Sequence, residues 1–244
     1  MNFKKVILEL NKILFPIAEV VIEINKKIKA FDEKNPEFFK NLSFYFKNMP
    51  EIKSNIWKKS AEYGWFPNWV TPILFDFAVQ NGKDELDKFM INHIVEDMNV
   101  IEKKIISLYP KRADIIKTAF LLHKQENFIA SIPLFLSQSD GIFSQNIGAY
   151  LFTDHEKRNT KITTIVENSS DIFEHVFWTP VLEKTQFAAS IGKSSKTLKD
   201  KAPNRNGILH GSRKHLDYGT KINSFKCISL LTYTAFIFDK EKNW

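Results

Sequence analysis

Apolar residues recur at steps of three and four near both ends of this chain of 244 residues. Such spacing gathers side chains on one face of an α-helix, whereas a half-buried strand alternates apolar and polar residues. Strand-like alternation is nowhere sustained, so we predict an all-α fold. The two stripes are Ile7, Leu10, Leu14, Ile17, Val21, Ile24, Ile28 and Phe31, and Tyr218, Ile222, Phe225, Ile228, Leu231, Ala235 and Phe238.

The N-terminal stripe steps as a heptad seam does, and two interpretations of it stay open. Residues 6–31 form either a core helix or a dimerisation helix. Pro16 lies inside the stripe and predicts a kink or a helix start. The C-terminal stripe predicts a long helix that packs against the core.

Proline and glycine breaks separate helical pieces along the rest of the chain. We expect an N-terminal helical region over residues 1–109, whose function the sequence does not reveal, and a helical domain over residues 110–244. In the first region the aromatic stretch GWFPNW, residues 64–69, either anchors a loop on the core or stacks on bases. In the second, Pro110 begins a helix, and residues 124–127 form the turn to the next helix.

The composition excludes several classes of protein. A chain that is 43% hydrophobic and holds 22 phenylalanines can build a substantial core, so we do not expect disorder. Its single cysteine excludes an intrachain disulfide, as is usual in a reducing cytoplasm. No stretch of about 18 uncharged apolar residues occurs, so we expect a cytoplasmic protein with no membrane span. The histidines share no ligand spacing with cysteines or paired carboxylates, and we expect no metal and no cofactor.

Positive charge is concentrated in one segment. Between residues 183 and 226 stand ten basic and three acidic residues, an excess of seven that equals the net charge of the whole chain. Localised positive charge favours a polyanion partner. The alternative interpretation is a solvated lysine-rich loop, and His215 beside Arg213 and Lys214 is interpreted as part of the same charge.

The centre of this basic segment reads PNRNGILHGSRKH, residues 203–215. Pro203 suits the first turn of a helix, and Gly211 suits the residue that ends one. The stretch therefore predicts a short helix from Arg205 to His210, whose two end side chains lie about 140° apart around the axis. It is either a surface turn or a site of chemistry.

The chemistry that these side chains suit is RNA cleavage. A neutral imidazole at His210 can accept the proton of the 2′-hydroxyl, which then acts as the nucleophile. Arg205 is always charged and can bind the phosphate through two hydrogen bonds while charge builds on it. Asn206 can orient either partner. The products would be a 2′,3′-cyclic phosphate and a 5′-hydroxyl, and no metal is required.

The stretch RNGILHG, followed by LDYGTKINSFKCISLL, resembles the HEPN superfamily (higher eukaryotic and prokaryotic nucleotide-binding domains). The signature of that family is Arg-x4–6-His with a polar residue after the arginine, and Arg205, Asn206 and His210 match it. The segment HGSRKHLDYGTKINSFK looks like the abortive-infection-like bacterial branch. Residues 132–143 resemble the acidic segment of that branch, with Asp140 at the acidic position. The resemblance covers residues 110 to 240.

The resemblance implies an up-down helical bundle that forms a homodimer, with a composite active site at the interface. Many members are metal-independent endoribonucleases of toxin–antitoxin or antiphage systems, whereas others bind nucleotides or RNA without cutting, or serve as assembly modules. The implied partners are RNA, either single-stranded or tRNA, and an antitoxin protein. The expected catalytic residues are Arg205, Asn206, His210 and Asp140. Of these, Asp140 would orient His210 or contact RNA. The expected RNA-binding residues are Lys199, Lys201, Arg213 and Lys214.

Overall fold

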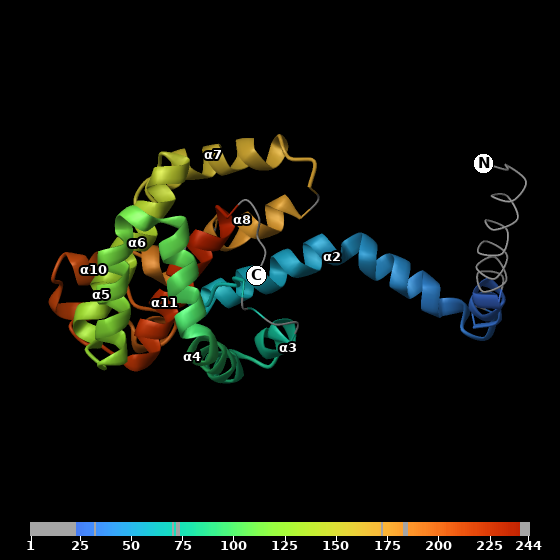
Figure 1. Ribbon diagram of the computed structural model, residues 1–244, viewed down its shortest axis with the longest axis horizontal. Coiled ribbons are helices and arrows are strands. Elements are labelled where there is room, and N and C mark those ends of the chain that lie inside the picture. Colours follow the sequence, from blue (N-terminus) through green and yellow to red (C-terminus); the bar gives the residue numbers. More distant parts are fainter. Residues whose placement is uncertain are drawn as a thin grey trace, which may run out of the picture. The chain divides into compact units, whose positions relative to one another are not determined.

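The computed structural model describes residues 23–31, 33–69, 71, 74–171, 173–182 and 185–239. Among these residues the chain forms helices and turns and no strand, so the all-α prediction is confirmed (Figure 1). The chain divides into two compact units, Met1–Met49 and Pro50–Trp244. The helix α2, Pro36–Glu62, runs through the boundary between them.

The first unit exposes apolar side chains. Residues 23–31 are helical, and their stripe members Ile24, Ile28 and Phe31 are 50%, 48% and 43% exposed. The earlier stripe members, Ile7 to Val21, lie outside the described residues. The ring of Phe31 meets that of Phe38 on α2 edge to face at 5.1 Å between centroids. In its described part, the stripe is therefore exposed on the first unit.

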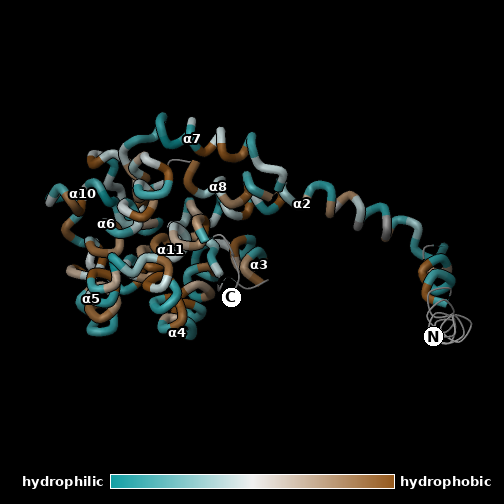
Figure 2. Tube along the Cα trace, turned by 45° about the horizontal axis from the view of Figure 1, so that its top comes forward, coloured by the Kyte–Doolittle hydropathy of each residue, from teal (hydrophilic) through white to brown (hydrophobic). Residues whose placement is uncertain are grey.

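The second unit is a bundle in which α4, α5, α6 and α11 pack against one another (Figures 1 and 2). The most extensive contact joins α6 to α11. The helices after α2 are α3 (Phe75–Gln80), α4 (Lys83–Leu108), α5 (Ala113–Lys124), α6 (Phe128–Ile147), α7 (His155–Glu167), α8 (Glu174–Leu182), α9 (Lys196–Lys199), α10 (Arg205–Leu209) and α11 (Lys221–Ile237). Short 3₁₀ turns occupy Pro110–Arg112 (η1), Gln186–Ala188 (η2) and Arg213–His215 (η3).

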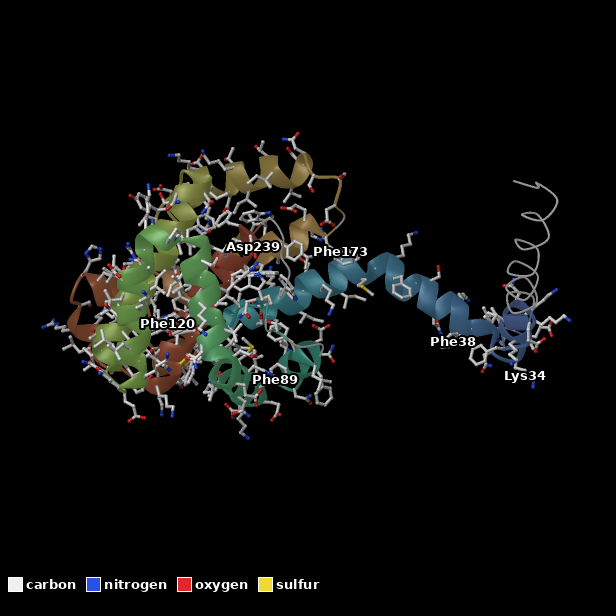
Figure 3. The ribbon with its side chains drawn as sticks, viewed as in Figure 1. Lys34, Phe38, Phe89, Phe120, Phe173 and Asp239 are labelled. Carbon is white, nitrogen blue, oxygen red and sulfur yellow. The ribbon has the colours of Figure 1, made fainter. Side chains whose placement is uncertain are left out.

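The hairpin of α5 and α6 forms where the sequence predicts it. Asn127 caps α6, and its side chain accepts a hydrogen bond from the backbone N–H of Ala130 at 3.4 Å. Phe120 of α5 is fully buried, and its ring lies 5.2 Å from that of Phe135 on α6 (Figure 3). None of the helices in the described ranges combines the length and the apolar character needed to cross a membrane.

The helix α11 lies at the centre of the core. All of residues 223–237 are buried, and the polar side chains among them bond to neighbouring segments or to the helix itself. Ser229 of α11 donates a hydrogen bond to the carbonyl of Phe66 at 3.0 Å and accepts one from its N–H at 2.9 Å. Trp65 and Phe66 are themselves buried, so the aromatic stretch at 64–69 is anchored on the core.

Lys226 brings a positive charge into this core. Its side chain is fully buried, and its Nζ donates hydrogen bonds to the carbonyls of Lys201 at 2.6 Å and Asp200 at 3.2 Å. The carboxylate of Asp87 on α4 lies 3.5 Å away and also accepts a hydrogen bond from Trp65. Burial lowers the pKa of Lys226 to about 8, and Asp87 partly opposes that shift. The ammonium thus ties the segment before α10 to α11.

The division of the chain differs from the predicted boundary at residues 109 and 110. The structure places the boundary between Met49 and Pro50, because α4 packs on α11 and Trp65 belongs to the same core. These contacts join residues far apart in sequence, and the proline and glycine breaks do not reveal them. Residues 50–109 therefore belong to the same unit as the predicted HEPN-like domain.

Gly64 allows the end of α2 to approach the segment before α10. It has φ +82°, and a methyl group there would lie 2.6 Å from the carbonyl oxygen of Lys201. Gly82 has φ +98° but no atom within 4 Å of such a methyl group. Both Gly64→Ala and Gly82→Ala should lose about 1–3 kcal/mol of unfolding free energy through backbone strain. Overpacking should cost Gly64→Ala about 1–3 kcal/mol more, measured by urea denaturation. Equal losses in the two variants would contradict the close approach.

Candidate active site

The short helix α10 is built by its cap and its glycines. Asn204 precedes it, and its side chain accepts a hydrogen bond from the N–H of Gly207 at 2.7 Å. The side-chain amide of Asn204 also donates to the carbonyl of Ala189 at 3.0 Å. Gly211 follows the helix with φ +62°, a conformation that favours glycine. The predicted short helix is confirmed, and it extends from Arg205 to Leu209.

Arg205 points toward α6. Its Nη2 lies 3.0 Å from Oδ2 of Asp140, and its Nη1 donates to Oδ1 of Asn206 at 3.1 Å. The guanidinium carbon lies 5.4 Å from the ring centroid of Phe152. The Nε atom is buried and has no hydrogen-bond partner in the described part of the chain. With the side chain only 18% exposed, these contacts set the orientation of the guanidinium.

Asp140 contacts Arg205, where the sequence analysis expected it to orient His210 or to contact RNA. It lies on α6 and is buried, and its second oxygen accepts a hydrogen bond from the N–H of Leu151 at 2.8 Å. Burial raises the pKa of Asp140, and the charge of Arg205 opposes that shift. Within one chain Asp140 is buried and His210 is exposed, so the predicted role of Asp140 in orienting His210 or contacting RNA stays a prediction.

His210 stands at the C-terminal end of α10, five residues after Arg205. Its side chain is exposed, and only its backbone N–H is bonded, to the carbonyl of Asn206 at 3.1 Å. No hydrogen bond or ion pair among the described residues engages the imidazole. One chain therefore directs the arginine inward and the histidine outward.

The four predicted RNA-binding residues lie in different local environments. Lys199 forms an ion pair with Asp217 at 2.7 Å and lines a cavity of about 280 Å³ beside Asn204. Lys201 lines a different cavity. Arg213 and Lys214 are exposed on η3. The hydrogen bond from Lys199 lowers the pKa of Asp217, so this lysine has a partner of its own.

His215 has a packing role that its basic neighbours in the sequence do not indicate. It is buried, and its Nε2 donates a hydrogen bond to the carbonyl of Ile191 at 3.0 Å. A methyl group on Gly207 would lie 2.1 Å from the Cδ2 atom of this ring. Gly207 thus allows the imidazole to pack directly on α10. Because His215 is buried, the interpretation of this residue as one more surface charge is corrected. The sequence signal of this packing was a glycine inside a short helix.

A second histidine lies deep in the core. His123 of α5 contacts Ser224 of α11 through a 2.7 Å hydrogen bond, and Ser224 contacts Ser131 at 3.1 Å. Burial lowers the pKa of His123 to about 4, so it is neutral near pH 7. The side chains of His123, Ser224 and Ser131 thus supply hydrogen-bond partners to one another between α5, α11 and α6. Elsewhere in the described ranges, no three side chains of His, Cys, Asp or Glu come together as a metal ion would require.

Comparisons of the chain with family models, with curated proteins and with solved structures find no match. The candidate site therefore depends on the motif and on the geometry of α10.

The packing of Gly207 on His215 can be tested by two glycine variants. Gly207→Ala should lose about 2–4 kcal/mol of unfolding free energy, because the ring must move and its hydrogen bond breaks. Gly192→Ala is the matched control, since a methyl group there meets nothing within 4 Å, and it should stay within about 0.5 kcal/mol of the parent.

A double variant makes this test specific. If the methyl group clashes with the ring, His215→Ala should reduce the cost of Gly207→Ala by about 1–3 kcal/mol in a double-mutant cycle. Additive losses, measured by urea denaturation, would show that Gly207 acts independently of His215.

Proposed function

We propose that this protein is a metal-independent endoribonuclease that acts as a homodimer. One observation carries the proposal: Asp140 and Asn206 hold the guanidinium of Arg205 in one orientation, while the imidazole of His210 is exposed on the same short helix. A phosphate-binding cation and a general base are the two groups that cleavage by the 2′-hydroxyl needs. The likeness of this motif to the HEPN signature supports the same function.

The proposed reaction begins with proton transfer. His210 takes the proton of the 2′-hydroxyl, and O2′ attacks the adjacent phosphorus. The P–O5′ bond breaks, and the 5′-oxygen receives a proton from the imidazolium of a second copy of His210. The products are a 2′,3′-cyclic phosphate and a 5′-hydroxyl.

Arg205 keeps donors for the phosphate in this arrangement. A guanidinium has five N–H donors, and Asp140 and Asn206 accept hydrogen bonds from one N–H each. Nε is buried, so the second N–H on each Nη atom is left to bind the non-bridging oxygens of the phosphate and stabilise the charge that develops there. Asp140 and Asn206 are positioning residues in this mechanism.

The geometry of α10 supports the proposed second chain. Side chains five residues apart on a helix differ in direction by about 140°. Arg205 of one chain therefore meets His210 of another more readily than its own. Two exposed apolar side chains flank His210 on its segment, Leu209 at 41% and Leu216 at 67%, and they suit a surface covered by a second copy.

Steering of RNA would come from the exposed cations. Arg213 and Lys214 are exposed and close to His210 in sequence, so they act at the mouth of the proposed site. Lys199 contributes less, because Asp217 compensates its charge. Uncontrolled RNA cleavage halts growth, so we further propose a cytoplasmic toxin or antiphage effector that an antitoxin protein restrains.

A second candidate function has its own observation. The guanidinium of Arg205 is already paired with Asp140 and is only 18% exposed, which favours an RNA-binding or dimerisation module without cleavage. Such a module would keep its RNA affinity in His210→Ala, and its binding would weaken as salt rises.

The proposed catalysis predicts cleavage of RNA by the purified protein in excess EDTA. His210→Ala should lower the rate by about 10²–10⁴-fold, because it removes the general base. The side chain of His210 has no hydrogen bond to lose among the described residues, so the variant should fold. His93→Ala, on α4, is the matched control and should cleave at the parental rate. The measurement is the rate of 2′,3′-cyclic phosphate formation on labelled RNA.

The outcome of this experiment separates the two candidate functions. Equal background cleavage by the parent and His210→Ala would refute the ribonuclease proposal. Retained, salt-sensitive RNA binding in that case would support the binding module.

The proposed dimer predicts a mass near twice the 28.5 kDa of the chain in sedimentation at micromolar concentration. Ile28→Lys places a charge on the exposed N-terminal stripe and should weaken association by about tenfold if the stripe contributes. Asn25→Lys, exposed on the same helix but off the stripe, adds the same charge and is the control for the charge change alone. A parent that sediments only as a monomer would remove the dimer from the proposal.

A further inference from the structure

A second cavity lies next to α10, outside the candidate active site. Its volume is about 240 Å³, and residues of α2, of η2 and of the segments on both sides of α9 line it. The lining residues that matter here are Lys58, Glu62, Gln186, Ala189, Lys193 and Lys201. All of them belong to the second unit of the chain.

The cavity is rich in positive charge. Three lysines line it, Lys58, Lys193 and Lys201, against the single carboxylate of Glu62. Neither Lys193 nor Lys201 forms an ion pair within the described part of the chain. The ammonium groups of Lys193 and Lys201 therefore favour an anion in this cavity. Thr185 and Ser190 add hydroxyl groups to the same wall.

The buried amide of Gln186 is an independent sign of a ligand. Gln186 is only 7% exposed, and its Nε2 has no hydrogen-bond partner among the described residues. Buried polar side chains nearly always have a partner, because a group removed from water and left unbonded costs free energy. Gln186 lines the cavity, and a small rotation of its side chain would offer the buried amide nitrogen to a ligand seated there.

We propose that this cavity binds a phosphate monoester whose body carries hydroxyl groups. The lysines and the Gln186 amide recognise the phosphate oxygens, and Glu62 accepts hydrogen bonds from the hydroxyls. A cavity of about 240 Å³ equals the volume of roughly eight water molecules, which suits a ligand the size of a sugar phosphate. This proposal does not depend on the ribonuclease proposal, since neither Arg205 nor His210 lines the cavity.

The wall of the cavity is bonded to α10. The carbonyl of Ala189 accepts hydrogen bonds from the side-chain amides of Asn204 at 3.0 Å and Asn206 at 3.4 Å. Lys201 also lines the cavity, and its carbonyl accepts a hydrogen bond from the buried Lys226. A ligand in the cavity therefore stabilises the segment that precedes α10 as well as the one that includes η2.

Titration of the full-length protein with ribose 5-phosphate tests the proposal. Calorimetry should show saturable binding, and the midpoint of thermal unfolding should rise as the ligand is added. Lys193→Ala and Lys201→Ala should each weaken binding by about tenfold, since each removes a charged hydrogen bond. Lys214→Ala, in the same basic segment but outside the cavity, should bind as the parent does.

Two further comparisons define the ligand class. Ribose without phosphate should not bind. Phenyl phosphate lacks the hydroxyl groups and should bind more weakly than ribose 5-phosphate. In Glu62→Gln, the difference in affinity between these two ligands should be smaller than in the parent. Gln186→Met keeps the side-chain length and removes the amide, so it should weaken binding while the variant stays folded. In hydrogen exchange, the ligand should slow exchange of the amides of residues 186–193.

Several results would overturn the proposal. Equal affinity in the parent, Lys193→Ala and Lys201→Ala would place the phosphate elsewhere. A response to ribose 5-phosphate no larger than that to chloride at equal ionic strength would show only general screening. The absence of saturable binding by ribose 5-phosphate would refute the proposal.

Discussion

The buried ammonium of Lys226 connects α11, α4 and the segment before α10, and the rest of the larger unit depends on this connection. It sits on the central helix α11 and bonds the carbonyls of Asp200 and Lys201, just before α10. The carboxylate of Asp87 on α4 balances the charge and accepts a hydrogen bond from the indole of Trp65, which follows α2. A charge removed from water is costly unless it is paired and fully bonded, so these contacts determine where the neighbouring segments lie.

The candidate active site follows from that placement. The segment before α10 is held on the core, α10 begins at its Asn204 cap, and Arg205 reaches Asp140 on α6. The helix is only five residues long, so its last turn ends at an exposed His210. The ion pair gives the arginine a fixed direction, and the exposure of His210 leaves the imidazole available. In the proposed dimer, the oriented Arg205 of one chain and the exposed His210 of the other would form one site.

The sugar-phosphate cavity that we propose and the candidate active site share structural supports. Ala189 forms part of the cavity wall and bonds Asn204 and Asn206 around Arg205. Lys201 contributes its side chain to the cavity and its carbonyl to Lys226. The basic segment thus does more than attract a polyanion: its cations are divided among an ion pair, a cavity and an exposed surface. A net charge counted along the sequence cannot show that division.

The sequence by itself determined the helical class, the turn between α5 and α6, the long C-terminal helix and the short helix at Arg205, because periodicity and capping are local properties of the chain. The sequence also identified Arg205, Asn206 and His210 as side chains suited to phosphate binding and proton transfer. Only the tertiary structure decided that Asp140 contacts Arg205, that His215 packs on Gly207, and that residues 50–109 share the core of α11. These outcomes depend on contacts between residues far apart in the chain. Burial, rather than local spacing, selects such contacts, since each buried polar group must find its partner wherever the fold brings one.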